Sequence, residues 1–260
     1  MIDLHSHVLP GLDDGPPDTI GSVAMADAAA AAGTRTLAAT PHLREDHPAV
    51  RPAELPGRVA ELNELLHRYE LDVRVVTGAE VAVTVIGDMS DDELRAVTLG
   101  GNGRDLLLET PYGELPSTYE ALVEGLGTRG FRVLAAHPER SPTLQADPAR
   151  LGRLVAAGVL VQLTAGSLAQ PRRSPSRRLA ITALENGWAH VLASDAHSAT
   201  WRPPDLAPGL KSARRALPHM GDEIAWMVND APRAILQGAP LPPRPPRNGR
   251  RSALWRRRSA

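Results

Sequence analysis

The sequence predicts an α/β fold whose parallel strands close into a barrel. The chain has 260 residues, a length at which a single α/β barrel is a common solution. About seven strand-like segments alternate with helix-like segments, which is typical of a parallel sheet. Six of the strand-like segments end in His, Asp or Glu. An open doubly wound sheet would gather ligands only near its switch point, so ligands at so many strand ends favour a closed barrel.

The first strand is expected at Ile2–His7, where apolar and polar side chains alternate. Residues two apart in a strand point to the same side, so His5 and His7 face one point, as metal ligands do. The Pro-Gly and Asp-Asp-Gly sequences that follow end the strand and place Asp13 and Asp14 in the adjoining loop. A His-x-His pair alone is also compatible with an ordinary polar strand end, so the rest of the chain has to decide.

The later strands repeat this pattern. They are expected at residues 36–40, 72–77, 106–108, 132–136, 159–163 and 189–194. Metal-binding side chains follow five of them: His42, Glu80, Glu109, His137, and the pair Asp195 and His197. The strand at 159–163 lacks such a residue, and its end is expected to offer backbone and hydroxyl groups instead.

Helices are expected between the strands, where apolar residues recur at helical spacing. They span residues 18–32, 51–69, 118–129, 149–157 and 176–186. The first of them places four residues on one apolar face: Ile20, Val23, Ala24 and Ala28.

The composition limits the chemistry and the location. The chain has no Cys, so any metal must be held by His, Asp and Glu, which favours Mn, Fe, Mg or Zn. Hydrophobic residues make up 42% and charged residues 23%, as in ordinary soluble globular proteins. Neither a membrane-spanning apolar run nor a secretion signal is recognisable, so a cytoplasmic location is expected.

Charge is unevenly distributed along the chain. Residues 240–260 contain seven arginines and no acid; removing these charges from the net charge of −1 leaves −8 for residues 1–239. The Pro- and Arg-rich end lacks apolar periodicity, so we expect one domain over residues 1–238 and a disordered basic tail over residues 239–260. The tail is either an expendable extension or a contact for anionic membrane or an acidic partner.

Taken together, the strand-end residues predict a metal cluster. Each one alone is compatible with a turn or a solvated side chain. Several charges converging at one end of a barrel would cost several kcal/mol per unpaired buried ion unless metals or protons neutralised them.

The motifs around these residues occur in a characteristic order. They are residues 3–7, 9–15, 39–42, 78–81, 109, 136–140, 162–168, 194–197 and 202–204. In these motifs the chain resembles the PHP (polymerase and histidinol phosphatase) superfamily, and within it the bacterial manganese-dependent protein-tyrosine phosphatases of the capsule-synthesis type. The segments Leu9–Gly15 and His137–Arg140 separate this branch from histidinol phosphatases and polymerase domains. The resemblance extends from Met1 to about Leu236.

The resemblance implies a distorted seven-stranded (β/α) barrel of PHP type with three metals. Mn²⁺ is the expected metal, with Fe, Zn and Mg as alternatives. The implied ligands are His5, His7, Glu80 and Asp195 for the first metal, Glu80, Glu109 and His137 for the second, and Asp14, His42 and His197 for the third. Asp14 is preferred over Asp13 on the family pattern alone. Arg140 and Arg202 match the arginines that would bind the phosphate.

The chain departs from the family pattern in three places. Leu43 stands where many members have a second histidine, and Ser141 where many have an aromatic residue. The segment 169–178 is unusually rich in Arg and Pro. These positions are expected on the rim of the site, so they bear on the substrate more than on the chemistry.

We therefore expect a phosphomonoester hydrolase in which metal-bound hydroxide attacks the phosphate. A phenolate leaving group, with a pKa of about 10, needs less protonation than an alkoxide, which suits phosphotyrosine. His42 or His197 could protonate the leaving group, and the sequence does not choose between them. The expected substrate is phosphotyrosine on a bacterial tyrosine kinase, including a membrane-associated one, or on an exopolysaccharide-regulating protein. Specific nucleic-acid binding is not expected.

Three alternatives remain open. One is a PHP phosphoesterase acting on a small phosphorylated metabolite or a nucleotide. A metal-dependent amidohydrolase would usually carry a bridging lysine, whereas the only lysine is Lys211, far beyond the last ligand strand. The third is a non-catalytic metal-binding regulatory module, although a complete ligand set argues against a site that has lost its activity.

Overall fold

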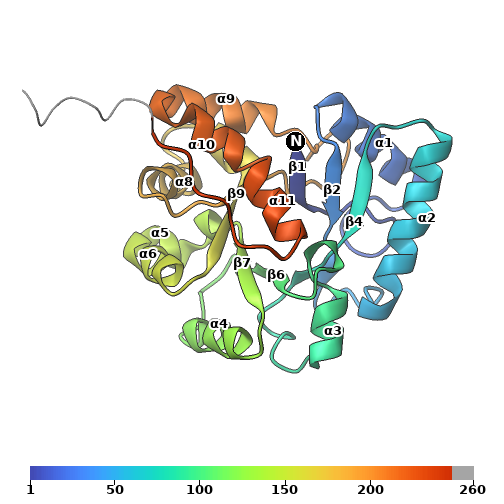
Figure 1. Ribbon diagram of the computed structural model, residues 1–260, viewed down its shortest axis with the longest axis horizontal. Coiled ribbons are helices and arrows are strands. Elements are labelled where there is room, and N and C mark those ends of the chain that lie inside the picture. Colours follow the sequence, from blue (N-terminus) through green and yellow to red (C-terminus); the bar gives the residue numbers. More distant parts are fainter. Residues whose placement is uncertain (248–260) are drawn as a thin grey trace, which may run out of the picture.

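Strands and helices alternate along the chain in the computed structural model, which describes residues 1–247 (Figure 1). The strands are β1 (Ile2–Ser6), β2 (Thr36–Ala39), β3 (His42–Leu43), β4 (Arg74–Thr77), β5 (Glu80–Val81), β6 (Asp105–Glu109), β7 (Arg132–Ala136), β8 (Leu160–Thr164) and β9 (Val191–Ala193). All the ladders between them are parallel. The predicted α/β class with parallel strands is confirmed.

The strands form two sheets, and the chain passes directly from one sheet into the other at two places. One sheet has the order β1-β2-β4 and the other the order β3-β5-β6-β7-β8-β9. The chain runs from β2 into β3 through Thr40 and Pro41, and from β4 into β5 through Gly78 and Ala79. β2 and β3 are therefore one interrupted strand, and so are β4 and β5. The nine strands thus follow seven paths.

Backbone contacts between β1 and the segment after β9 link the two ends of this series. An isolated parallel bridge joins Ser6 to Ala196, the amide of Asp195 donates to the carbonyl of His5 over 2.9 Å, and the amide of His7 donates to Ala196 over 2.8 Å. β1 therefore lies beside the segment that follows β9, through this short contact instead of a regular ladder.

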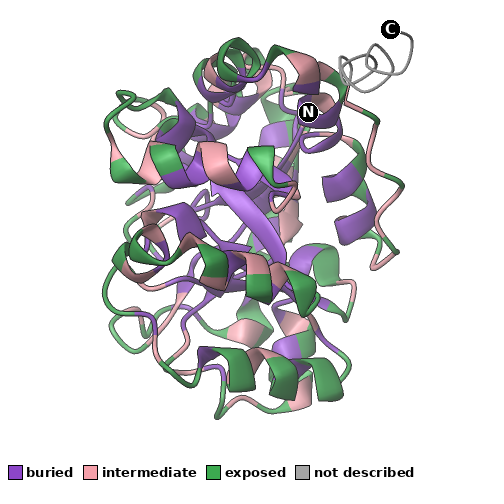
Figure 2. Ribbon diagram, turned by 90° about the vertical axis from the view of Figure 1, so that its left-hand side faces the viewer, coloured by how far each residue is buried: buried purple, intermediate pink, exposed green. Residues whose placement is uncertain are grey.

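Helices surround the strands, and their outer faces are exposed while the strands are buried (Figure 2). The helices are α1 (Thr19–Ala31), α2 (Leu55–Arg68), α3 (Asp91–Ala96), α4 (Tyr119–Thr128), α5 (Pro142–Ala146), α6 (Pro148–Ala156), α7 (Ala165–Ala169), α8 (Pro175–Glu185), α9 (Ala207–Ala216), α10 (Gly221–Trp226) and α11 (Asp230–Leu236). Short 3₁₀ turns lie at η1 (Pro52–Glu54), η2 (Leu99–Gly101), η3 (Pro138–Arg140) and η4 (Pro218–Met220). All five predicted helices are present, and α3, α5, α7, α9, α10 and α11 are additional to the prediction.

The orientation of α1 differs from the expected one. The helix begins after Asp18, whose carboxylate accepts a hydrogen bond from the amide of Gly21 over 2.8 Å. Its buried residues are Ser22, Met25, Ala26 and Ala29, while Ile20 is 81% exposed. The predicted apolar face was wrong because an alanine-rich helix is weakly amphipathic, so the pattern of apolar residues hardly fixes which side packs.

The end of the described chain lies against α10 through two arginines. Arg244 and Arg247 bind the carboxylate of Glu223, with contacts of 2.6 Å and 2.7 Å. Glu223 is only 1% exposed, so these contacts neutralise a buried charge. The predicted tail starts at residue 239; its first residues make these contacts, and the part from residue 248 lies outside the described residues. Within residues 1–247, no helix is long and apolar enough to cross a membrane.

Candidate metal centre

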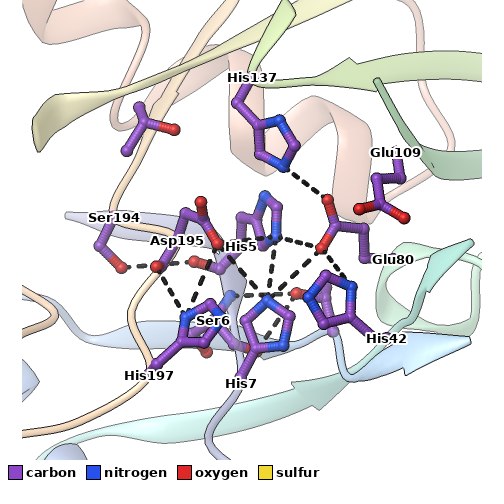
Figure 3. A network of polar contacts seen from close by, with 12 residues as sticks. His5, Ser6, His7, His42, Glu80, Glu109, His137, Ser194, Asp195 and His197 are labelled. Atoms are coloured by element: carbon purple, nitrogen blue, oxygen red, sulfur yellow. Dashed lines mark hydrogen bonds and ion pairs between the residues drawn. The ribbon is translucent and has the colours of Figure 1, made fainter. Parts of the chain in front are cut away.

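The structure brings all nine predicted ligands together where the strands end. Figure 3 labels all of them except Asp14, and their side chains point towards one another from strands and from the residues that follow strands. All of these are buried, whereas Asp14, in the loop after β1, is half exposed. The polar residues that end the strands thus meet at the carboxyl ends of the strands. This is where α/β barrels have their active sites.

Four side chains form the centre of the cluster. Nε2 of His5 lies 3.3 Å from Nε2 of His7, 3.1 Å from Oε2 of Glu80 and 3.3 Å from Oδ1 of Asp195. Nε2 of His7 is 3.5 Å from each of the same two carboxylate oxygens. The four ligand atoms thus surround one point, and they belong to the four residues expected for the first metal.

Glu80 links this group to a second one. The parallel register places His42 opposite Glu80, and His42 Nδ1 lies 3.1 Å from Oε2 of Glu80. Glu109, at the end of β6, completes a group of three possible ligands with them. His137, expected at this second site, contacts the other oxygen of Glu80 over 2.7 Å. Glu80 therefore meets His42 through one carboxylate oxygen and His137 through the other.

A third group gathers around Asp14. Its Oδ1 lies 3.2 Å from Nε2 of His197, 3.7 Å from Nε2 of His42 and 3.8 Å from Nδ1 of His7. These contacts, which oppose the effect of partial burial, hold the pKa of Asp14 well below its usual range. The group contains the three residues expected for the third metal, with His7 in addition.

Two further residues, neither of them predicted to do so, orient the central histidines. Oε1 of Gln162, on β8, lies 3.0 Å from Nδ1 of His5. Oδ2 of Asp13 lies 2.6 Å from Nδ1 of His7 and also accepts from the amide of His42 over 2.9 Å. Each acceptor fixes a hydrogen on Nδ1, which leaves the Nε2 lone pair free for a metal, as in many metal sites.

The histidines and carboxylates of the cluster shift one another's pKa values. Burial opposes protonation of His5 and His7, but the carboxylates beside them outweigh it, so the pKa of each histidine lies above its ordinary value. Burial alone would raise the pKa of Glu80 and Asp195, but the adjacent histidines hold both pKa values well below the usual range. The cluster therefore favours ionised carboxylates beside cationic groups.

The residues present fit a divalent metal. Oε2 of Glu80 and Nδ1 of His42 are buried, face each other and form no hydrogen bond with the described residues. Nitrogen and oxygen donors at this spacing suit a first-row divalent ion. Such an ion could replace the protons that lie between the histidines and the carboxylates.

Two of the candidate ligands have an unusual backbone conformation. His137 has a φ of 35° and Asp195 a φ of 55°, although neither is glycine. Such left-handed conformations cost roughly 1–3 kcal/mol and are often found at functional sites. Both residues follow directly or closely on a strand end, where the backbone turns their side chains towards the cluster.

Two arginines reach the cluster from its open side. Nη1 of Arg140 lies 2.5 Å from Oδ2 of Asp195, and Arg202 contacts the same oxygen. Arg140 also donates to the hydroxyl of Tyr112 over 2.7 Å, and the Tyr112 ring stacks on His137. Arg202 lies 3.1 Å from Nε2 of His197. The pair of guanidinium groups offers a binding place for an anion next to the candidate metal ligands.

Comparison with known proteins places these features in a family. A family profile described as "Capsular polysaccharide synthesis, CpsB/CapC" matches residues 1–237. The chain is 30% identical over 256 residues to the tyrosine-protein phosphatase YwqE of Bacillus subtilis, covering 98% of this chain and 99% of that protein. It is 32% identical over 209 residues to the putative tyrosine-protein phosphatase CapC of Staphylococcus aureus, covering 78% and 79%.

Solved structures agree with this assignment. The chain superposes with a TM-score of 0.84 and 29% identity on a structure from a study of YwqE from Bacillus subtilis and CpsB from Streptococcus pneumoniae, described there as unique metal-dependent tyrosine phosphatases. The match covers 96% of this chain and 100% of that one. A β-aspartyl dipeptidase from Fervidobacterium islandicum, at a TM-score of 0.53 and 14% identity over 91% of this chain and 72% of that one, shares the fold alone.

Proposed function

Because the chain belongs to the CpsB/CapC family of capsular polysaccharide synthesis, we propose that it is a metal-dependent protein-tyrosine phosphatase. YwqE is named a tyrosine-protein phosphatase, and the chain covers nearly its whole length. The observation that carries the proposal is the buried group of His5, His7, Glu80 and Asp195 with two arginines at its open side. Metal ligands and phosphate-binding donors thus share one site.

The candidate metal ligands are the nine residues described above. Bound divalent metals would activate a water molecule as nucleophile and reduce the negative charge that an incoming phosphate meets. Mn²⁺ is our proposal for the native ion, supported by the mixed His and carboxylate donors and by the absence of Cys from the chain.

Arg140 and Arg202 are proposed to bind the nonbridging oxygens of the phosphate. Both now contact one oxygen of Asp195, so each must transfer some of its donors to an arriving phosphate. A planar guanidinium group can donate hydrogen bonds to two phosphate oxygens at once. It can also stabilise the negative charge on these oxygens as that charge is redistributed in the transition state. Tyr112, bound to Arg140 through its hydroxyl, keeps that guanidinium at the mouth of the site.

The structure favours a ligand role over an acid role for His42. Its Nδ1 faces Glu80 and its Nε2 faces Asp14, so both ring nitrogens point to candidate metal ligands. His197 is placed differently: its Nδ1 lies 3.0 Å from the carbonyl of Asp195, which leaves Nε2 facing Asp14 and Arg202. A phenolate can leave without full protonation, so the proposed reaction does not depend on either histidine as acid.

The proposed substrate is phosphotyrosine on a protein. A tyrosine kinase that uses ATP would supply it, so we propose that the enzyme acts in the cytoplasm on such a kinase, including a membrane-associated one, or on its protein substrates. The support for this substrate is that relatives of the chain, YwqE and the CpsB of Streptococcus pneumoniae, are named tyrosine-protein phosphatases and CapC a putative one.

The test is phosphate release from a phosphotyrosine peptide, a phosphoserine peptide and histidinol phosphate, with Mn²⁺ and with a chelator. We expect chelator-sensitive turnover confined to phosphotyrosine, and a loss of roughly 100-fold or more in kcat/KM for Arg140→Ala. Arg68→Ala, an exposed arginine on α2, is the matched control and should behave as wild type. Turnover of histidinol phosphate alone would make the protein a small-metabolite phosphatase; inactivity with metal bound would point to a binding module.

A further inference from the structure

A basic pocket lies between the α7–α8 connection and α9. It has a volume of about 540 Å³, and its cationic lining residues are Arg172, Arg177, Lys211 and Arg215. A second hollow of about 490 Å³, lined in part by Arg172, Arg177 and Arg178, adjoins it. Arg177 lies on α8 and Lys211 and Arg215 lie on α9, two helices on the outside of the domain (Figure 1). None of the nine candidate metal ligands lines either hollow.

The positive charge of this basic pocket is unbalanced. None of its four cations forms an ion pair within the part of the chain that the structure describes. Residues 169–184 contain four arginines and no acid, although residues 1–239 carry a net charge of −8. Four uncompensated cations around one hollow in an acidic domain create a local positive potential that attracts anions.

One of these cations is held in place by the helices on both sides. Nη2 of Arg177, on α8, donates to Oγ of Ser212, on α9, over 3.3 Å, and that hydroxyl donates to the carbonyl of Leu168 over 2.7 Å. Nε of Arg177 is shielded from solvent and has no partner among the described residues. A guanidinium anchored at one corner with free donors elsewhere is prepared to bind an anion without a large loss of side-chain entropy.

The floor of the pocket is rigid as well. α7 and α9 approach so closely at Gly209 that an added Cβ would lie 2.3 Å from the carbonyl oxygen of Ala165. Because no side chain fits between the two helices, α9 cannot shift towards α7, which fixes the backbone that carries Lys211 and Arg215 relative to α7.

The first turn of α8 is also connected to the turn that carries Arg140. Nε2 of Gln145 lies 3.3 Å from Oγ of Ser176, and it donates to the carbonyl of Glu139 over 2.9 Å. Glu139 precedes Arg140 in η3. The basic pocket is therefore a separate site, but its helix is one side-chain link from the phosphate-binding edge of the metal centre.

We propose that the basic pocket is a second phosphoryl-binding site that takes a phosphate monoester or free phosphate dianion. Arginine forks match the oxygens of a phosphoryl group, and two or more cations are needed to neutralise its double charge. The volume exceeds that of a single phosphate group, so the pocket also admits the side chain or the water molecules that accompany it. The proposal concerns binding and does not depend on the activity at the metal centre.

The test is the number of phosphate ions bound by the full-length, Mn²⁺-loaded protein, measured by isothermal titration calorimetry with inorganic phosphate. We expect two classes of site in the wild type. Arg177→Gln combined with Lys211→Gln should remove one class or weaken it by at least about tenfold. Arg58→Gln combined with Arg74→Gln, which removes two exposed cations elsewhere, is the matched control and should keep both classes. Circular dichroism of each variant shows whether the fold is retained.

Further binding experiments identify the molecule that carries the phosphoryl group. A fluorescent phosphoserine peptide that binds the wild type but not the pocket variant would show that a phosphorylated side chain enters the basic pocket; binding of inorganic phosphate alone would assign it to the free ion. The proposal is overturned if the pocket variant binds phosphate as the control does, or if acetate competes as well as phosphate does. Binding to phosphatidylserine vesicles that the variant loses, without any change in phosphate binding, would overturn it in favour of a membrane contact.

Discussion

Replacing Asp13 by Ala should weaken metal binding without removing a metal ligand. The carboxylate of Asp13 contacts Nδ1 of His7 over 2.6 Å, and both side chains are fully enclosed. A hydrogen bond to a charged acceptor in such surroundings contributes about 1.5–3 kcal/mol. With 1.36 kcal/mol for each factor of ten, the metal dissociation constant should rise about 10–100-fold, the range found for outer partners of metal-bound histidines.

The assay is competition for Mn²⁺ with a fluorescent chelator at constant pH. Asp27→Ala, which removes an exposed carboxylate from α1, controls for the loss of one negative charge. Asp13→Asn retains one amide oxygen and should fall between wild type and Asp13→Ala. A dissociation constant for Asp13→Ala within twofold of the Asp27→Ala control would refute the claim that Asp13 orients His7 for metal binding.

Two further predictions concern stability. Burial, followed by the charge of Arg244, lowers the pKa of His190 from 6.5 to about 4. The unfolded chain therefore takes up a proton that the folded protein does not, and the free energy of unfolding should fall by about 2 kcal/mol between pH 7 and pH 5 on account of this group. His190→Gln should lose that contribution in denaturant titrations at the two pH values; an identical pH dependence would contradict it. Arg244→Gln combined with Arg247→Gln should destabilise the protein by about 3–5 kcal/mol, because the buried Glu223 loses both cations. Adding Glu223→Gln should restore part of the melting temperature, and no recovery would show that the charge is not the cause.

The ends of the strands were predictable because they depend on local sequence. β6 and β7 are both apolar runs that end at a polar residue. This pattern predicted both ends of β7 correctly and each end of β6 to within one residue. The parallel arrangement then brought the residues at those ends together without any knowledge of side-chain contacts. The candidate ligands His137 and Glu109 could be found in this way because each stands where its strand ends or directly after it.

The contacts within the site could not be predicted in the same way. The contact of Gln162 with His5 spans 157 residues, and whether it forms depends on the register across several strands. The grouping of His42 with Glu80 likewise follows from their pairing in adjacent strands, which no local pattern reveals. The buried face of α1 was predicted wrongly for the opposite reason. The apolar pattern there is local, but alanine is equally acceptable on every side of a helix, so the pattern does not decide which side packs.

The interruption of two strands makes the metal centre a junction between the two sheets. His5 belongs to the three-stranded sheet through β1, whereas Glu80 belongs to the six-stranded sheet through β5, and their ligand atoms are 3.1 Å apart. A metal held by both would tie the sheets together and would stabilise only the folded chain, by an amount that grows with the free metal concentration. Degradation by proteases, which requires local opening, would then slow as the metal supply rises. The lifetime of the protein in the cell would thus follow the availability of its metal even where no substrate is present.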